Sequence, residues 1–481
     1  MLHTKDIKNL SELTSTFCSK HKKSEFFTDF VSILQLGKLH ACFSKAKQKG
    51  VSTKQLLEIL LSFPFLGQNN VHRFINSSWS CFVDYGKDVY YRLKKNANIH
   101  WRGLLLGTVI QALKTLKPYQ SNSKEVKAFI FDDTTIKKTG YKIEGVSRVW
   151  NHVINKTVLG YQLLVMGYYD GTMFIPVNFS FHREKGKNEK TPYGLKPKHY
   201  RKQKKKKRAK ESYGFARKKE LNSSKIASCV SMLELAVKKG ITCKYVLTDS
   251  WFTCWELVKT AIDHNLKYIG MFSKATTKFT YRDTAMTYKQ IRKYNRKKIK
   301  KNRKFNLYYI RTVVLWNGTP VVLYFTRKGK KGKWKTLLNT ELSSSFNQTV
   351  ETYQIRWSIE VFFKECKQYL GLGKSQSTDF DVQIADTTIA MMQHLFLSIK
   401  NRIEKYETLG ELFENTKAEC LEIKLHQRLL ALLIAIAEVI DEIFIEVDSC
   451  QLISRMIHNP EAFEKLKLLI NPQETSYKNS A

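Results

Sequence analysis

The chain has 481 residues with 82 Lys and Arg against 42 Asp and Glu, and its formal net charge of +40 favours an anionic partner, of which nucleic acid is the usual one. Its nine Cys form no C-x-x-C pair, which argues against a zinc knuckle or a disulfide framework. No apolar run reaches the roughly 18 residues of a membrane-spanning helix and the first residues lack the apolar core of a signal peptide, so we expect a soluble, cytoplasmic protein without membrane contacts.

Residues 1 to about 120 are predicted to be helical. The segment STKQLLEILLSF begins with a capping-box pattern from Ser52 to Gln55 and continues with apolar residues at helical spacing. A small helical domain with a basic exterior suits recognition of a DNA end, and a plain scaffold fits this pattern equally well.

Strands are predicted next. The segments VKAFIFDD, VWNHVINKTVLGYQLLVMGYYDG and TMFIPVNFSFHRE are rich in β-branched and aromatic residues, and a D-G turn separates the last two. They predict a meander of three strands.

A dense cationic run, KPKHYRKQKKKKRAK, covers residues 196–210 and follows the meander. We expect a loop or a helical extension that follows a DNA backbone, although a nuclear-localisation sequence is another interpretation of such a run. The residues expected to bind DNA here are Lys204, Lys205, Lys206, Lys207 and Arg208. Residues 291–304 form a second cationic segment.

Helices and strands then alternate. SSKIASCVSMLELAVKKG and WELVKTAIDHN are predicted helices, and each precedes a short apolar strand, KYVLTDS or LKYIGMFS. The order βββαβαβ predicts an α/β fold in which helices flank a mixed sheet. Ribonuclease H-like nucleases and integrases have the same order of elements. This likeness concerns the fold alone.

A β-rich insertion is expected at about 275–345, with a hairpin at Asn317-Gly318. The chain becomes helical again from 382. We therefore expect a helical DNA-binding domain at 1–120, a catalytic domain at 121–381 that includes the insertion, and a helical region at 382–481 that would contribute to dimerisation.

The segment YQIRWSIEVFFKECK is predicted to form one amphipathic helix. At 100° per residue, its polar residues fall within one narrow arc, and these are Tyr353, Arg356, Glu360 and Lys367. Its apolar residues form a separate stripe that would anchor the helix on a core. The nearby GLGKS does not make a phosphate loop, since Gln368 occupies the first glycine position.

Three acidic positions at the ends of predicted elements suggest chemistry. Asp132 and Asp133 end one apolar strand, Asp249 ends another, and Glu360 lies on the polar arc. Such a set could hold two Mg²⁺ ions for phosphoryl transfer. Each residue also has an ordinary explanation, because Asp is common in turns and caps and Glu360 could pair with Arg356 at i, i+4.

These residues carry a resemblance. Y-x2-R-x3-E-x6-K is satisfied from Tyr353 to Lys367, and it is similar to the signature of the insertion sequence 4 family of DDE transposases. DDTT and LTDSWF resemble that family's two aspartate blocks. The similarity covers roughly residues 125–380.

The resemblance implies that Asp133, Asp249 and Glu360 are catalytic and bind two Mg²⁺ ions, with Mn²⁺ as a substitute. Asp133 is preferred to Asp132 because the family's Asp precedes Thr, as Asp133 precedes Thr134. Adjacent strand residues face opposite ways, so one of the two must point elsewhere. Tyr353, Arg356 and Lys367 would hold phosphates of the DNA end.

In related enzymes an aromatic residue of the insertion stacks on a flipped base. Trp316 and Trp334 are the candidates in this chain, and packing in a core is the alternative for each.

Together these features predict a bacterial, nucleoid-associated transposase that cuts and pastes an insertion sequence by metal-dependent strand cleavage and 3′-hydroxyl strand transfer. Its partners would be double-stranded DNA, as terminal inverted repeats and target, and a second copy of the chain in a homodimer on DNA. The alternatives are a metal-dependent nuclease of the same fold without strand transfer, and a non-catalytic DNA-binding descendant.

Overall fold

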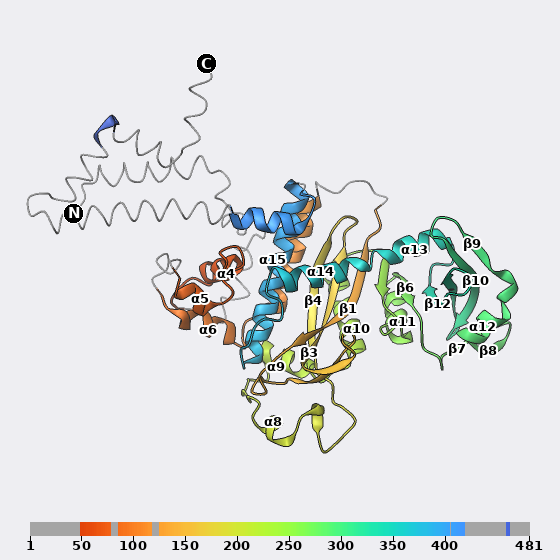
Figure 1. Cartoon of the computed structure of the whole chain (residues 1–481), viewed down its shortest axis with the longest axis horizontal. Coiled ribbons are helices and arrows are strands. Elements are labelled where there is room, and N and C mark those ends of the chain that lie inside the picture. The colour runs from red at the N-terminus through yellow and green to blue at the C-terminus, as the bar shows by residue number, and fades with distance from the viewer. Residues whose placement is uncertain (1–48, 78–84, 118–124, 405, 419–457, 462–481) are drawn as a thin grey trace, which may run out of the picture.

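The computed structural model describes residues 49–77, 85–117, 125–404, 406–418 and 458–461. The expectations of helices in 1–48 and 419–457 therefore lie outside the described residues. Within the described part, helices surround one large mixed sheet of twelve strands, which is the α/β architecture expected and is compatible with a ribonuclease H-like fold (Figure 1).

The centre of the sheet has the strand order β4-β3-β1-β5-β6. Its strands are β1 (Ala128–Lys137), β3 (Lys156–Tyr169), β4 (Phe174–His182), β5 (Tyr245–Thr248) and β6 (Lys267–Met271). β1, β5 and β6 are parallel, whereas β3 is antiparallel to both of its neighbours β1 and β4. All of β4 and β5 is buried, as expected for strands covered on both faces.

Helices cover the two faces of this central sheet. One face carries α10 (Lys225–Lys238) and α11 (Trp255–Asp263), which pack on each other. The other carries α7 (Trp101–Leu116), α14 (Trp357–Gln368) and α15 (Phe380–Glu404), and Figure 1 shows α14 crossing the strands on this side. The two helical layers thus contribute side chains to opposite faces of β1.

The meander contains one more strand than predicted. The expected second strand is divided into β2 (Ser147–Asn151) and β3 by a turn at residues 152–155. Asn155 closes the turn at φ 49°, a left-handed conformation that Asn tolerates. An apolar pattern alone did not reveal a turn that contains Val153 and Ile154.

The β-rich insertion continues the same sheet. β12 (Lys335–Asn339) pairs with β6, and the sheet extends through β11 (Thr319–Lys328) and β10 (Leu307–Trp316). The predicted hairpin at Asn317-Gly318 is confirmed, because both residues have positive φ and Trp316 pairs with Thr319. The short strands β7 (Lys278–Tyr281), β8 (Thr284–Thr287) and β9 (Lys300–Asn302) and the helix α12 (Tyr288–Tyr294) complete this part.

The helix predicted at 353–367 is interrupted. α13 (Phe346–Gln354) ends before Ile355, and α14 begins at Trp357. Backbone bonds of the i to i+3 type join the two, from Arg356 N to Tyr353 O and from Ile359 N to Arg356 O. The assumption of one regular helix was therefore wrong, although Ile359, Phe362 and Cys366 are buried as predicted.

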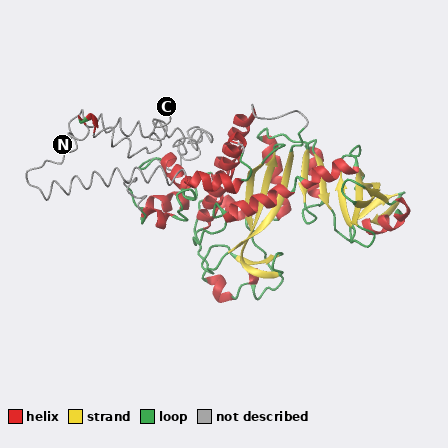
Figure 2. Ribbon diagram, turned by 45° about the horizontal axis from the view of Figure 1, so that its top comes forward, coloured by secondary structure: helices red, strands yellow, loops and turns green. Residues whose placement is uncertain are grey.

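The described N-terminal helices pack beside α15. They are α4 (Thr53–Ser62), α5 (Val71–Ile75) and α6 (Lys87–Lys95), together with α7. Ser52 precedes α4 as the N-cap residue, but the predicted side-chain capping bond is not formed. Two short helices, α8 (Pro197–Arg201) and α9 (Tyr213–Glu220), lie between β4 and α10, and Figure 2 separates these helices from the strands by colour.

Among the described residues, no helix is long and apolar enough to cross a membrane.

Candidate functional site

Two acidic positions lie level with each other at the carboxyl edge of the parallel strands. Phe131 of β1 pairs with Thr248, the last residue of β5. Asp132 and Asp249 are the next residues on each strand, so the parallel register places them side by side. The carboxyl edge of a parallel sheet is a common position for a functional site.

Asp132 and Asp133 face opposite helical layers. Asp132 Oδ2 accepts a hydrogen bond from Arg356 Nη1 of the α14 layer at 3.0 Å. Asp133 Oδ2 accepts one from Lys225 Nζ, the first residue of α10, at 2.6 Å. The strand alternation thus places Asp132, and not the expected Asp133, on the side of Glu360.

Arg356 joins the acidic positions on this side. Its Nη2 donates to Glu360 Oε1 at 2.5 Å while Nη1 donates to Asp132, so one guanidinium bridges β1 and α14. The guanidinium also lies 5.8 Å from the centre of the Tyr353 ring. Arg356 Nε is buried and has no hydrogen-bond partner among the described residues.

Lys367 completes the expected set. Its Nζ donates to Thr134 Oγ1 at 2.5 Å, two residues beyond Asp132 on the same face of β1. Tyr353, Arg356, Glu360 and Lys367 therefore gather along one side of β1, even though the helix that carries them is interrupted.

The pKa values of Asp132 and Asp249 are both raised, chiefly by burial. Burial, and after it the negative charge of Asp249, raises the pKa of Asp132 to about 7, and Arg356 only partly offsets this. Burial also raises the pKa of Asp249, against two backbone N–H groups that lower it, and the negative charge of Asp133 adds to the rise. Such perturbed carboxyl groups are typical of functional sites.

The position of Asp249 is fixed by its own loop. Its Oδ1 accepts hydrogen bonds from Trp251 N at 2.9 Å and Phe252 N at 3.2 Å. The hydroxyl of Thr253 donates to the carbonyl of Asp249 at 2.9 Å. This compact turn holds the carboxyl group at the end of β5 without help from the rest of the site.

The donor set is suited to a hard divalent cation. Asp132, Asp249 and Glu360 offer carboxylate oxygens, the ligands that Mg²⁺ prefers, and the raised pKa of Asp132 indicates negative charge that a cation would relieve. In the described part of the chain, no group of three or more His, Cys, Asp or Glu is arranged to hold a metal ion. The guanidinium of Arg356 instead bridges Asp132 and Glu360.

A second cluster surrounds Asp133. Lys225, which binds Asp133, lies 3.9 Å above the centre of the Trp251 ring, and the Trp251 side chain is 48% exposed. Trp357, next to Arg356, is 62% exposed. Lys225, Trp251 and Trp357 were not predicted from the sequence, because no spacing pattern links α10 to β1.

Three of the five residues predicted to bind DNA in the cationic run are engaged in ion pairs within the protein. Residues 204–209 have no regular secondary structure, and less exposed and exposed residues alternate along them. Lys204, Lys206 and Arg208 bind acidic residues, whereas Lys205 and Lys207 are exposed. Only Lys205 and Lys207 of the five predicted residues are thus free of a described ion pair and directed to solvent.

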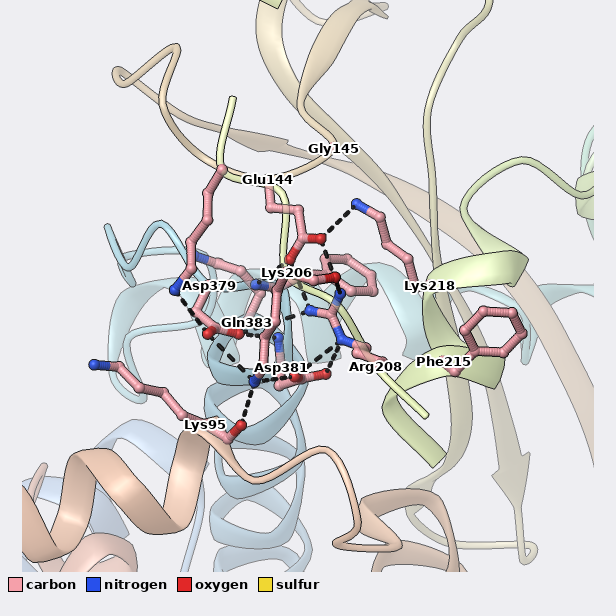
Figure 3. A network of polar contacts seen from close by, with 12 residues as sticks. Lys95, Glu144, Gly145, Lys206, Arg208, Phe215, Lys218, Asp379, Asp381 and Gln383 are labelled. Carbon is pink, nitrogen blue, oxygen red and sulfur yellow. Dashed lines mark hydrogen bonds and ion pairs between the residues drawn. The ribbon is translucent and has the colours of Figure 1, made fainter. Parts of the chain in front are cut away.

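Figure 3 shows the centre of this ionic network, which we call the strap. Arg208 donates to Glu144 at 2.7 Å and to Asp381 at 3.1 Å, and its side chain is only 2% exposed. Lys206 binds Asp381 and Asp379 and donates to the carbonyl of Lys95. The strap therefore ties residues 203–209 to the start of α15 and to the end of α6.

The two tryptophans of the insertion have different environments. Trp316 is 4% exposed and packs on Trp255, Phe272 and Phe279, with ring centres 5.4 to 5.6 Å apart. A buried ring of this kind cannot stack on a base, so the core alternative holds for Trp316.

Trp334 is half-buried at the edge of a cavity of about 340 Å³. The cationic residues that line this cavity are Lys289, Arg292, Lys293 and Arg296. Arg292 and Arg327 lie over the Trp334 ring, at 5.6 and 4.6 Å from its centre. The insertion thus offers an aromatic wall among cations, which suits a phosphate-bearing ligand.

The sheet and the acidic residues at its carboxyl edge define an α/β protein with a site suited to phosphoryl transfer. Comparison with known families agrees: residues 95–313 match the family model of the DDE superfamily endonuclease. The match supports a DDE transposase-type family and a nuclease-type activity on DNA for the matched segment. It includes Asp132 and Asp249 and ends before Glu360. None of the curated proteins compared with the chain matches it.

Proposed function

We propose that this protein is a DNA transposase of the insertion sequence 4 type, whose catalytic carboxylates are Asp132, Asp249 and Glu360. One observation carries the proposal: Asp132 is level with Asp249 on the sheet and is connected to Glu360 through Arg356. The three acidic residues come from three separate elements and approach one edge of the sheet. The family match over residues 95–313 supports the same class.

The proposal replaces Asp133 by Asp132 in the catalytic set. Asp133 lies on the α10 side of β1 and is bound to Lys225 at 2.6 Å. Asp132 lies on the side of Glu360, to which Arg356 connects it, and it interacts electrostatically with Asp249. Asp133 then acts by positioning α10 and the Trp251 loop.

Asp132, Asp249 and Glu360 would hold two Mg²⁺ ions, or Mn²⁺ in their place. These ions would supply activation of water or of a 3′-hydroxyl and stabilisation of the leaving oxygen. The residues of the chain bind and orient the DNA. Arg356 has a planar fork suited to phosphate, and its Nε is without a partner among the described residues. Lys367 adds a point charge beside Thr134.

The wider DNA surface includes Lys205, Lys207 and the cavity beside Trp334. These groups bring positive charge to two separate parts of the chain, and the net charge of +40 favours such a polyanionic partner. We infer that the DNA comprises the terminal inverted repeats and the target of a bacterial insertion sequence. Two ends brought together would require a homodimer on DNA.

The test is a strand-transfer assay with Mg²⁺, using DNA that carries the terminal repeats flanking the gene. The native protein should produce cut ends and then joined products. Asp132→Asn should abolish both, whereas the matched variant Asp133→Asn should retain the products at a reduced rate. If Asp133→Asn is inactive and Asp132→Asn is active, the assignment of the carboxylates is wrong.

The same assay distinguishes the two alternatives. A nuclease without strand transfer gives cut DNA but no joined product. A non-catalytic descendant binds the repeats and gives neither product, although the presence of all three carboxyl groups argues against it.

A further inference from the structure

The hairpin of β2 and β3 ends in an apolar tip that the proposed chemistry does not use. We propose that this tip, formed by Trp150, Val153 and Ile154, inserts as a wedge between base pairs of bound DNA and bends it. The proposal rests on the proposed function only in taking DNA as the partner.

The tip exposes side chains that a folded protein usually buries. Val153 is 90% exposed, the highest value among the large apolar side chains that the structure describes. Ile154 is 43% and Trp150 39% exposed. An exposed apolar group of this kind commonly marks an interaction site.

The turn is rigid, which suits a wedge. The side chain of Asn151 is buried, and its Oδ1 accepts hydrogen bonds from Val153 N at 3.0 Å and Ile154 N at 3.4 Å. Asn155 then returns the chain to β3 at φ 49°. The two apolar residues are thus presented in a fixed orientation, so little conformational entropy is lost when they bind.

Hydrogen bonds also hold the base of the hairpin in place. Trp150 N donates to both carboxylate oxygens of Glu184 at 3.2 Å. The carbonyl of Trp150 accepts from Gln162 Nε2 at 2.7 Å. Gln162 in turn accepts from Thr135 of β1, two residues from Asp133. These hydrogen bonds would therefore transmit a lateral force on the tip to the central sheet.

Charge selects nucleic acid as the partner. Residues 147–157 include Arg148 and Lys156 but no acidic residue. Glu184, the acid nearest in contact, is held against the Trp150 backbone and is flanked in sequence by Arg183 and Lys185. Apolar groups inside a cationic rim suit insertion into a base stack, because the cations bind the phosphates on either side.

The position of the tip places it away from the cleavage site. Val165 of β3 is opposite Asp132, and Lys156 lies nine residues nearer the tip. At roughly 3.3 Å per residue this is about 30 Å, the length of about nine base pairs of duplex. Figure 2 shows the hairpin strands reaching beyond the rest of the central sheet, beside the loops around α8. The tip would therefore act on DNA next to the cleaved bond, without taking part in the chemistry.

Insertion of a wedge requires free energy to unstack base pairs, and DNA that is already kinked requires less of it. The experiment compares binding of the full chain, without divalent metal, to two 60-base-pair duplexes of the same sequence. One duplex is continuous and the other has a three-adenine bulge at its centre. The native protein should bind the bulged duplex about ten-fold more tightly. The double variant Val153→Ser, Ile154→Ser should lose this preference.

The matched control is Val313→Ser. Val313 lies on β10 and is 42% exposed, so its replacement changes an apolar surface residue far along the sheet from the hairpin. This variant should keep the native preference. Energy transfer between dyes at the ends of the continuous duplex should report a bend for the native protein and for the control, but not for the tip variant.

The proposal is overturned if the native protein binds both duplexes equally, or if the tip variant keeps the preference and the bend. It is also overturned if the tip variant changes the oligomeric state of the DNA-free protein in sedimentation, since the tip would then contact a second copy. Because no cleavage is measured, a wedge can be confirmed even where strand transfer fails, and strand transfer can be observed where the wedge fails.

Discussion

Arg356 and Asp132 form an ion pair of 3.0 Å between residues 224 positions apart in the sequence. The pair brings the start of α14 to the edge of β1, where the same guanidinium also holds Glu360. The positive charge that joins two proposed metal ligands comes from the protein itself. Binding of DNA and of divalent cations should therefore be coupled through Arg356.

The variant Arg356→Ala should change the binding of divalent cations and the binding of DNA in opposite directions. The variant removes the cation between Asp132 and Glu360, so their repulsion should increase the affinity for Mn²⁺. Loss of a phosphate contact should weaken DNA binding and lower its dependence on salt by about one unit of slope. Calorimetric titration with Mn²⁺ and binding assays over a range of salt measure the two effects. Unchanged Mn²⁺ affinity would show that Arg356 does not compete with the metal.

The raised pKa of Asp132 predicts a pH dependence of stability. The pKa is about 7 in the folded chain against 3.8 as the ordinary value, so the folded state binds more protons between these two pH values. Stability attributable to this group should therefore fall as the pH rises from about 4 to about 7, by on the order of 1.4 kcal/mol per unit of pKa difference.

Urea unfolding at pH 5 and pH 8 without metal checks this sign. Asp132→Asn should be less sensitive to the rise in pH than the native protein. Asp133→Asn, whose parent side chain binds Lys225, serves as the control and should keep the native sensitivity. A variant difference of the opposite sign would contradict the assignment of burial and Asp249 as the causes.

Divalent cations should stabilise the native protein through the same carboxyl groups. We expect Mn²⁺ to raise the Tm at pH 8, where Asp132 is ionised, and to raise it less at pH 5. Asp132→Asn and Glu360→Gln should each remove most of the increase, and a chelator should reverse it. A rise in Tm that persists in both variants would place the metal elsewhere.

The ion pairs of the strap predict that replacing one residue remote from the site should strongly lower the free energy of unfolding. Arg208→Ala leaves the buried Glu144 without its shortest ion pair and removes one of the two cations that bind Asp381, which should cost about 3–5 kcal/mol in the free energy of unfolding. Lys205→Ala, three residues earlier on an exposed side chain, should change stability by less than about 0.5 kcal/mol. Urea unfolding of both variants measures the contrast, and equal losses would contradict it.

The exposed lysines of the same segment should show the reverse behaviour. Lys205→Ala with Lys207→Ala should weaken DNA binding and lower the salt slope by about two units, with stability unchanged. Titration of a labelled duplex at several salt concentrations provides the measurement. If the double variant binds DNA as the native protein does, this segment is not part of the DNA surface.

The sequence predicted the order of the central elements well, because alternating apolar segments and turns carry that information locally. It could not decide between Asp132 and Asp133. The four residues before them, Ala128 to Phe131, are all buried, so their pattern does not reveal which face of β1 is which. Only the partners, Arg356 and Lys225, make the distinction, and they lie on helices distant in the sequence.

The cationic run illustrates a second limit. A local charge count assigned all of residues 204–208 to DNA binding and could not reveal the counter-ions Glu144, Asp379 and Asp381, which are distant in the sequence. The same limit applies to Trp316, whose aromatic neighbours come from three other elements or loops. Long-range pairing therefore determined which of the predicted residues remain available for DNA.

The edge-to-edge pairing of β12 with β6 has a mechanical consequence. It makes the insertion a continuation of the central sheet, in which Leu337 and Leu338 of β12 pair with Met271 and Gly270 of β6. An insertion joined to the sheet in this way should resist rotation relative to the sheet. Bound DNA should therefore deform more easily than the insertion. When DNA binds, most of the conformational change should therefore occur in the DNA and not in the insertion that carries Trp334.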